Sequence, residues 1–153
     1  MTALQLRPAV PGDLDAIWAI ETAVFGAEAW SRDMMHEELT AQHRCYLVLH
    51  DEAGRILGYG GLLAVGDEGD IQTIAVDAAV RGAGQGRRVM QALLDAAAER
   101  AVRKVFLEVR ADNPVARGLY ASLGFVEIAV RPRYYQPDDV DAVVMMREME
   151  DQQ

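Results

Sequence analysis

The segment from residue 71 to residue 101 constrains the fold of this chain more than any other. It contains IQTIAV, then VRGAGQGRRVM, then apolar residues at helical spacing: Val89, Met90, Leu93, Leu94, Ala97 and Ala101. Residues 71–76 are mostly apolar, which indicates a buried strand, and the three glycines that follow indicate a tight turn. A strand, a glycine-rich turn and an amphipathic helix in this order predict an α/β protein.

The N-terminal third predicts one strand and two helices. A strand with alternating leucines stops at Pro8, and Pro11 suits the first turn of a helix whose apolar face continues to Phe25. Glu21 falls inside this apolar stripe, and we expect it to lie at the edge of the stripe rather than to bind an amine. Ser31 is a residue type that begins helices, so it predicts a second short helix.

The remaining chain continues the alternation. A turn signal joins two strand-like runs, and further strands and one helix follow: strands over residues 45–49, 56–64, 105–109, 125–130 and 142–146, and a helix over residues 113–122 that is stopped by Gly124. This order predicts a mixed α/β sheet with helices on both faces.

Composition limits the class of protein. The 153 residues, 51% of them hydrophobic, fit one globular domain over residues 1–153. A single cysteine, no basic-then-apolar leader and no run of about 20 apolar residues predict a cytoplasmic protein without a membrane span. A net charge of −9 argues against a nucleic-acid partner and favours a basic one.

The glycine turn predicts an anion site. At a helix N-terminus the free backbone N–H groups carry partial positive charge, and glycines let a phosphate approach the backbone. A P-loop would continue from Gly86 with Lys and Ser or Thr, whereas Arg87 and Arg88 follow here. A dinucleotide fingerprint would place glycine at position 87 and would lie near the first strand. Neither motif is present.

The spacing Arg81-x-x-Gly84-x-Gly86 after IQTIAV resembles the coenzyme A pyrophosphate loop of the GCN5-related N-acetyltransferase (GNAT) family. LEVRADNPVARGLYASLGF resembles the next segment of that family, and the late RPRYYQPDDVDAVVMM is similar to its ribosomal-protein alanine N-acetyltransferase subfamily. The resemblance spans most of the chain and implies the GNAT fold, with a mixed, mostly antiparallel central sheet, and acetyl-CoA as co-substrate. One departure is Ala29, where related sequences often have proline before the tryptophan.

The resemblance implies which residues hold acetyl-CoA. The backbone of Ile74, Ala75 and Val76 would pair with the pantetheine arm. The pyrophosphate would lie against the turn residues Gly82, Ala83, Gly84, Gln85, Gly86 and Arg87. An extended arm that carries amides can pair with a strand edge, and an anion suits the start of a helix. Asn113 is a further expected contact, although capping the following helix is an equal role for it.

Acetyl transfer to an amine needs a base, a stabilised oxyanion and a proton for the departing thiolate. Glu108 lies in the apolar strand VFLEVR, where desolvation could raise its pKa toward that of a useful base; the alternative is an outward-facing residue paired with Arg110. Tyr120 is the candidate proton donor, or a core tyrosine. Backbone N–H groups near Ile74 and Ala75 could hold the oxyanion. The resemblance implies the same two catalytic residues, with direct attack in a ternary complex.

The acceptor follows from the subfamily resemblance, which implies the N-terminal alanine of a small-subunit ribosomal protein. An α-amino group has a pKa near 8 against about 10.4 for lysine, so it deprotonates more readily. The acidic residues Asp138, Asp139 and Asp141 could attract such a basic protein or be an ordinary solvated loop. The candidate walls of the peptide site are Phe25, Trp30 and Tyr134, each of which could equally be core.

Alternatives remain at this point: acetylation of lysine or of a small-molecule amine, or a non-catalytic module that senses acyl-CoA. Cys45 has no basic partner within its strand, so we expect it to pack as a small hydrophobe. His36, His43 and His50 form no metal-ligand spacing with Cys45, and we predict no metal.

Overall fold

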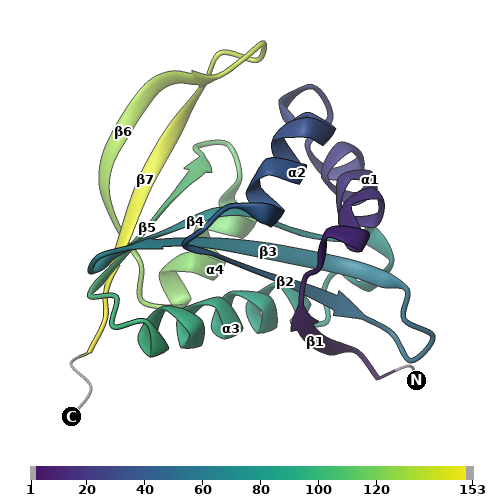
Figure 1. Cartoon of the computed structure of the whole chain (residues 1–153). Helices are drawn as coiled ribbons and strands as arrows, with labels where there is room; N and C mark the ends of the chain where they lie inside the picture. Colours follow the sequence, from purple (N-terminus) through teal and green to yellow (C-terminus); the bar gives the residue numbers. More distant parts are fainter. Residues whose placement is uncertain (1–2, 151–153) are drawn as a thin grey trace.

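The computed structural model describes residues 3–150, which form one seven-stranded sheet between two layers of helices (Figure 1). The strands lie in the order β1-β2-β3-β4-β5-β7-β6. They are β1 (Gln5–Pro8), β2 (Arg44–His50), β3 (Ile56–Val65), β4 (Glu68–Val76), β5 (Lys104–Arg110), β6 (Val126–Tyr135) and β7 (Val140–Glu148). The helices are α1 (Leu14–Phe25), α2 (Arg32–Thr40), α3 (Gln85–Glu99) and α4 (Pro114–Ser122), with 3-10 turns η1 (Pro11–Asp13), η2 (Gly26–Glu28) and η3 (Ala78–Val80).

The sheet is mixed and mostly antiparallel, as the sequence predicts. Five neighbouring pairs are antiparallel, and only β4 and β5 run parallel. The last two strands form a hairpin, but the sheet inserts β7 between β5 and β6, so β6 is an edge strand. Residues of β5 and β6 therefore face each other only across β7.

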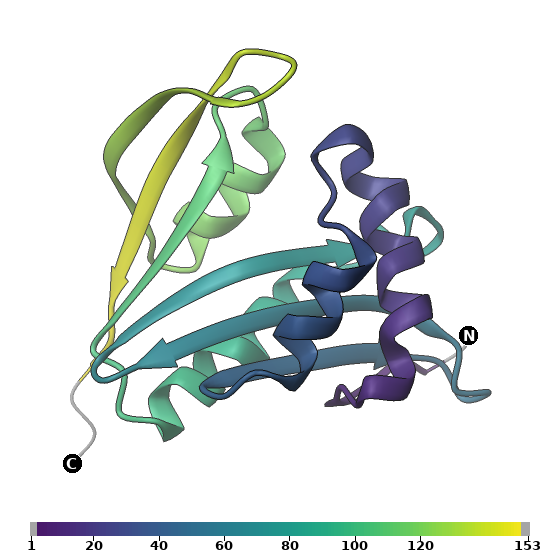
Figure 2. The same cartoon turned by 45° about the horizontal axis from the view of Figure 1, so that its top comes forward.

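Two apolar cores lie on opposite faces of the sheet. On one face, α1 and α2 pack over β2, β3 and β4 around Ile17, Met35 and Tyr59, all fully buried. On the other face, α3 and α4 pack around Leu93, Val105 and related residues. The expectation of helices on both faces is confirmed. The half of the sheet made by β5, β7 and β6 has no helix on the α1 side (Figure 2).

Local signals set the helix ends where the sequence places them. Ser31 caps α2 by accepting a hydrogen bond from the Met34 backbone N–H at 3.1 Å. The chain leaves α4 through Gly124, whose φ of +95° is the left-handed conformation that glycine adopts without strain. The side chain of Asn113 caps α4 by accepting from the Ala116 N–H at 3.1 Å. The capping role expected for Asn113 is therefore confirmed.

Strands β4 and β5 pair at only three positions and then separate. The pairing begins at Glu68 and ends at Asp70, and a bulge in β4 follows, because Gly61 and Leu62 of β3 pair with Thr73 and Ile71 and leave Gln72 without a partner. A bulge bends a strand and increases its twist. In Figure 2 the two halves of the sheet meet near this point and then diverge. The divergence leaves the β5-facing edge of residues 71–76 without a strand partner within the described chain.

Candidate active site

The start of α3 offers free backbone donors. Its N-cap residue, Gly84, has a φ of +79°, and no side chain in the described chain caps the helix. The first intrahelical donor is the Arg88 N–H, so the three N–H groups before it have no helical acceptor. A Cβ at Gly82 or Gly84 would meet no atom within 4 Å, so the surface above the turn is open. This geometry fits an anion such as a pyrophosphate.

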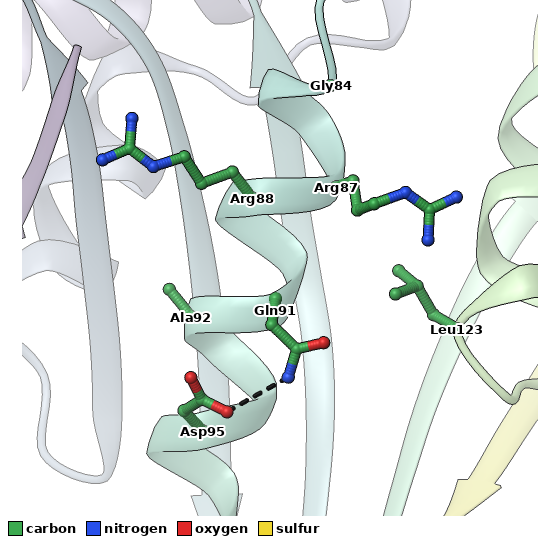
Figure 3. A pocket seen from close by; sticks show the side chains of 7 residues that line it. All are labelled: Gly84, Arg87, Arg88, Gln91, Ala92, Asp95 and Leu123. Carbon is green, nitrogen blue, oxygen red and sulfur yellow. Dashed lines mark hydrogen bonds between the residues drawn. The ribbon is translucent and has the colours of Figure 1, made fainter. Parts of the chain in front are cut away.

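The arginines after the turn do not converge. Figure 3 shows the Arg87 and Arg88 side chains leaving α3 on opposite sides, in a depression of about 440 Å³ along the exposed face of the helix. Arg87 donates to the Ser122 hydroxyl at 2.7 Å, and Arg88 donates to the carbonyl of Leu4. The two guanidinium groups therefore lie apart, Arg87 beside α4 and Arg88 beside the segment that precedes β1.

The separated edge of β4 carries Ile74, Ala75 and Val76, the residues expected to pair with an extended arm. Their other edge pairs with β3, since Ile74 lies opposite Gly60 and Val76 opposite Gly58. Along the edge that faces β5, the backbone N–H and C=O groups have no strand partner within the described chain. A linear ligand with amide groups can bind such an edge as an additional strand would.

Glu108 lies on the open face of β5, opposite Val144 of β7. Its carboxylate accepts from Arg131 of β6 at 2.6 Å, and 30% of its side-chain surface remains exposed. Two expectations are corrected here. The apolar strand does not desolvate Glu108, because alternation turns only Val105, Leu107 and Val109 into the core. Its cation is Arg131 rather than the Arg110 of its own strand.

Tyr120 projects from α4 into the core that α4 shares with β5. It is 9% exposed and packs edge-on against Phe125, with ring centroids 6.2 Å apart. Burial raises the pKa of Tyr120 to about 12. Its hydroxyl forms no hydrogen bond within residues 3–150, so the phenol proton is available to a bound molecule. The core position named as the alternative is confirmed, and it does not exclude proton donation.

Two tyrosines at the end of β6, Tyr134 and Tyr135, lie near the Glu108 carboxylate. Burial and the nearby Glu108 raise the pKa of both Tyr134 and Tyr135. The Arg131 guanidinium lies 4.5 Å from the centroid of the Tyr134 ring, and the two tyrosine rings meet edge-on with centroids 5.1 Å apart. Tyr134 is 47% exposed. It therefore lies beside the candidate base, where the sequence expected a wall of the acceptor site.

The acidic residues beyond these tyrosines are engaged locally. Asp138 lies 3.2 Å from Arg110, Asp139 lies 3.7 Å from Arg133, and Asp141 accepts from the Arg133 backbone N–H at 2.9 Å. Asp138 and Asp139 lie in the β6–β7 loop and Asp141 lies in β7, and each of the three contacts an arginine. The expectation that this loop attracts a basic protein through unpaired charge is weakened by these contacts.

Phe25, the last residue of α1, and Trp30 of the α1–α2 loop are the other two expected walls. Both are partly buried against the α1 core, so their side chains serve the core as well. The Trp30 backbone carbonyl accepts from the indole N–H of Trp18 at 3.2 Å. Between them, Glu28 crosses to β5 and forms an ion pair with Arg110. Sequence reasoning left Glu28 without a role, because its partner lies 82 residues away.

Glu21 is fully buried, not at the edge of the helix stripe as expected; it is 1% exposed. Its Oε1 accepts from the hydroxyls of Tyr59 and of Thr73, the latter at 3.1 Å, and its Oε2 accepts from the Trp30 N–H at 2.8 Å. The Glu21 carboxylate raises the pKa of Tyr59 in addition to burial. Glu21 thus attaches the acceptor-side loop to β3 and β4. The sequence feature that could have indicated this buried role is the position of Glu21 within the apolar stripe of the helix.

Comparison with known proteins settles the family. The model of the acetyltransferase (GNAT) family matches residues 14–125. The chain belongs to this family. An uncharacterised Mycobacterium leprae protein is 40% identical over 143 residues, which are 90% of this chain but only 39% of that protein. The N-alpha-acetyltransferase RimI of Mycobacterium tuberculosis is 36% identical over 137 residues, which are 86% of this chain and 84% of that protein.

A solved structure extends the likeness over nearly the whole chain. The ribosomal-protein-S18-alanine N-acetyltransferase from Escherichia coli has a TM-score of 0.91 and 29% identity, and the match covers 99% of this chain and 97% of that one. The GNAT fold inferred from the glycine turn is therefore confirmed. The chain is an acetyltransferase of this family, with RimI proteins among its relatives.

The remaining sequence predictions concern Cys45, metal sites and membrane spans. Cys45 is half-buried against the α3 core, and burial raises the pKa of its thiol, as expected for a packing residue rather than a nucleophile. Within residues 3–150, no group of three or more His, Cys, Asp or Glu side chains is arranged to bind a metal. No helix in this part of the chain is long and apolar enough to span a membrane.

Proposed function

We propose that this protein transfers the acetyl group of acetyl-CoA to the α-amino group of a protein N-terminus, by direct attack in a ternary complex. The proposed acceptor is the N-terminal alanine of a small-subunit ribosomal protein. The observation that carries the proposal is the separation of β4 from β5 after Asp70, which leaves the β4 edge without a strand partner in the described chain, in a fold that also has an uncapped start of α3 and Glu108 on the open face of β5.

The start of α3 and the unpaired edge of β4 each suit one part of acetyl-CoA. The backbone N–H groups of residues 85–87 suit the pyrophosphate, and the unpaired edge of residues 74–76 suits the amide-bearing pantetheine arm. When bound, acetyl-CoA supplies the activated acyl group. Backbone N–H groups near Ile74 and Ala75 then stabilise the charge that develops on the carbonyl oxygen. Asn113 remains a proposed contact, since its side chain already caps α4.

Glu108 and Tyr120 divide the proton transfers. Glu108, which pairs with Arg131, takes the proton that the amine loses as its nitrogen bonds to the acetyl carbon. The carbon–sulfur bond then breaks, and Tyr120 gives its phenol proton to the thiolate. The exposed position of Glu108 allows an acceptor to reach it.

Two considerations support an α-amine as acceptor. At pH 7 about one α-amino group in ten is neutral, against fewer than one lysine in a thousand, so a carboxylate base of ordinary strength suffices for the former. Relatives of this chain are named N-alpha-acetyltransferase RimI and ribosomal-protein-S18-alanine N-acetyltransferase. A ribosomal acceptor is basic, which matches the net charge of −9. Location in the cytoplasm stays a prediction.

The experiment offers the protein acetyl-CoA with four peptides. Three begin with Ala, Ser or Met, and the fourth has a blocked N-terminus and an internal lysine; mass spectrometry then locates the acetyl group. Acetylation of the N-terminal alanine supports the proposal. Acetylation of the lysine peptide alone would show that the acceptor class is wrong, and coenzyme binding without any acetylation would indicate the sensing module instead.

A further inference from the structure

Arg110, the last residue of β5, contacts three carboxylates from three separate segments. Its Nη1 pairs with Glu28 of η2, its Nε and Nη2 lie 2.9 Å from the two oxygens of Asp112, and its Nη2 lies 3.2 Å from Asp138 of the β6–β7 loop. The guanidinium also lies 5.6 Å from the centroid of the Tyr135 ring. One cation therefore joins the three segments that border the acceptor face.

The geometry of the fold gives this contact its importance. Figure 2 shows the loop between α1 and α2 and the loop between β6 and β7 on opposite sides of the diverging strands. The two loops belong to different layers, and the cores on the two sides of the sheet do not hold them against each other. The Arg110 contacts connect them directly. We call the contacts of Arg110 with Glu28 and Asp138 the arginine clasp.

The Arg110–Glu28 contact of the clasp differs from an ordinary surface ion pair in its burial, whereas the Asp138 side chain is 59% exposed. The Glu28 side chain is 16% exposed and that of Arg110 is 25% exposed, whereas the Arg32–Asp15 pair between α2 and α1 is 51% and 81% exposed. Exposed pairs contribute little, because water screens them and the long side chains lose entropy. A shielded carboxylate that loses its cation is destabilised and moves toward solvent. The hydrogen bond to Asp112 and the other carboxylates around Arg110 raise its pKa above the ordinary value for arginine, so Arg110 stays charged.

We propose that Arg110 and Glu28 are positioning residues that hold the α1–α2 loop over the acceptor face and thereby set how tightly the acceptor binds. The clasp acts on the acceptor alone, because neither residue lies on the β4 edge or at the start of α3, where acetyl-CoA is proposed to bind. This inference rests on the proposed function, which assigns the face with Glu108 and Tyr134 to the acceptor. Neither residue is proposed to touch the reacting atoms.

Steady-state kinetics of Arg110→Gln and Glu28→Gln test the clasp. Arg32→Gln is the matched control, because it breaks an ion pair between α1 and α2, the two helices that flank the loop, outside the clasp. Each clasp variant is expected to raise the KM for the alanine peptide roughly tenfold, or about 1.4 kcal/mol. The KM for acetyl-CoA and kcat should change less than about twofold, within what a surface substitution does. The double variant should be no worse than Arg110→Gln, since both remove the same contact.

Other outcomes overturn the inference. If the variants lower the melting temperature but leave the peptide KM unchanged, the clasp is only structural. If the two substitutions have additive effects, the residues do not act as a pair. Hydrogen exchange covers the case in which the wild type acetylates none of the peptides, where the proposed acceptor fails separately. Faster exchange at residues 26–31 in Arg110→Gln, but not in Arg32→Gln, would then support the loop-holding role, and equal exchange would refute it.

Discussion

Nη1 of Arg131 lies 2.6 Å from Oε1 of Glu108, although the two residues belong to strands that do not touch. Glu108 is on β5 and Arg131 is on β6, and the pair spans β7, where Val144 and Ala142 lie opposite them. The contact requires that both side chains point to the open face. It supplies the candidate base with a counter-ion on the open face, where the acceptor is proposed to bind.

Replacement of Glu108 by Gln tests the base. The shape of the side chain is kept and its ability to accept a proton is lost, so kcat with the alanine peptide should fall at least about 100-fold. Binding of acetyl-CoA, measured by calorimetry, should stay within about twofold of wild type. Glu127→Gln on β6 is the matched control, because Glu127 also pairs with an arginine but faces α4. Unchanged turnover in Glu108→Gln would exclude this carboxylate as the base.

Removal of the Tyr120 hydroxyl tests the acid and also predicts a pH effect on stability. Tyr120→Phe should lower kcat while the fold is kept, since the phenyl ring fills the same site. Burial raises the pKa of Tyr120 to about 12 in the folded protein, against about 10 unfolded. The folded state therefore binds the proton more tightly, and stability falls as pH rises from about 10 to about 12.

The stability effect has its own measurement. Urea unfolding at pH 8 and pH 11 should show a smaller alkaline loss in Tyr120→Phe than in wild type, by about 1.4 kcal/mol, because pH 11 lies midway between the unfolded and folded pKa values. An equal alkaline loss in wild type and Tyr120→Phe would show that other buried tyrosines, such as Tyr59, account for it.

A methyl group at Gly84 tests the anion site. The φ of +79° makes Gly84→Ala unfavourable by about 1 kcal/mol, and the new Cβ lies where the pyrophosphate is proposed to approach. Acetyl-CoA binding should weaken on the order of tenfold. Gly54→Ala in the β2–β3 turn, with a φ of +86°, adds the same strain away from the coenzyme. Comparable weakening in both variants would attribute the effect to strain alone.

Truncation of Glu21 should destabilise the protein strongly. Glu21→Ala leaves the hydroxyls of Tyr59 and Thr73 and the Trp30 N–H without their acceptor, which costs roughly 2–4 kcal/mol. Glu21→Gln should cost less, because the amide oxygen can accept from Trp30 while the two hydroxyls accept from the amide nitrogen. Urea unfolding measures both. The exposed Glu37→Ala on α2 is the control, expected within about 0.5 kcal/mol of wild type.

The order of strands and helices could be predicted from the sequence because it depends on local patterns. The glycine turn, the cap at Ser31 and the stop at Gly124 each satisfy hydrogen bonds or backbone angles within a few residues. The apolar stripe of α3 points to its buried side chains in the same way. These features sufficed for the order of strands and helices, and the GNAT fold followed from the resemblance of the glycine turn and of residues 107–125 to that family.

Pairing across the sheet could not be predicted in this way, because it depends on which strands become neighbours. The sequence by itself determined the order of the elements and most helix ends, whereas β4, β6 and β7 are longer than the strands predicted over residues 71–76, 125–130 and 142–146. Only the tertiary structure decided that Glu108 pairs with Arg131, that Glu28 pairs with Arg110 and that Glu21 is buried. The physical reason is that β7 inserts between β5 and β6 and that β4 bends away from β5 at its bulge, and both result from packing between segments far apart in the chain.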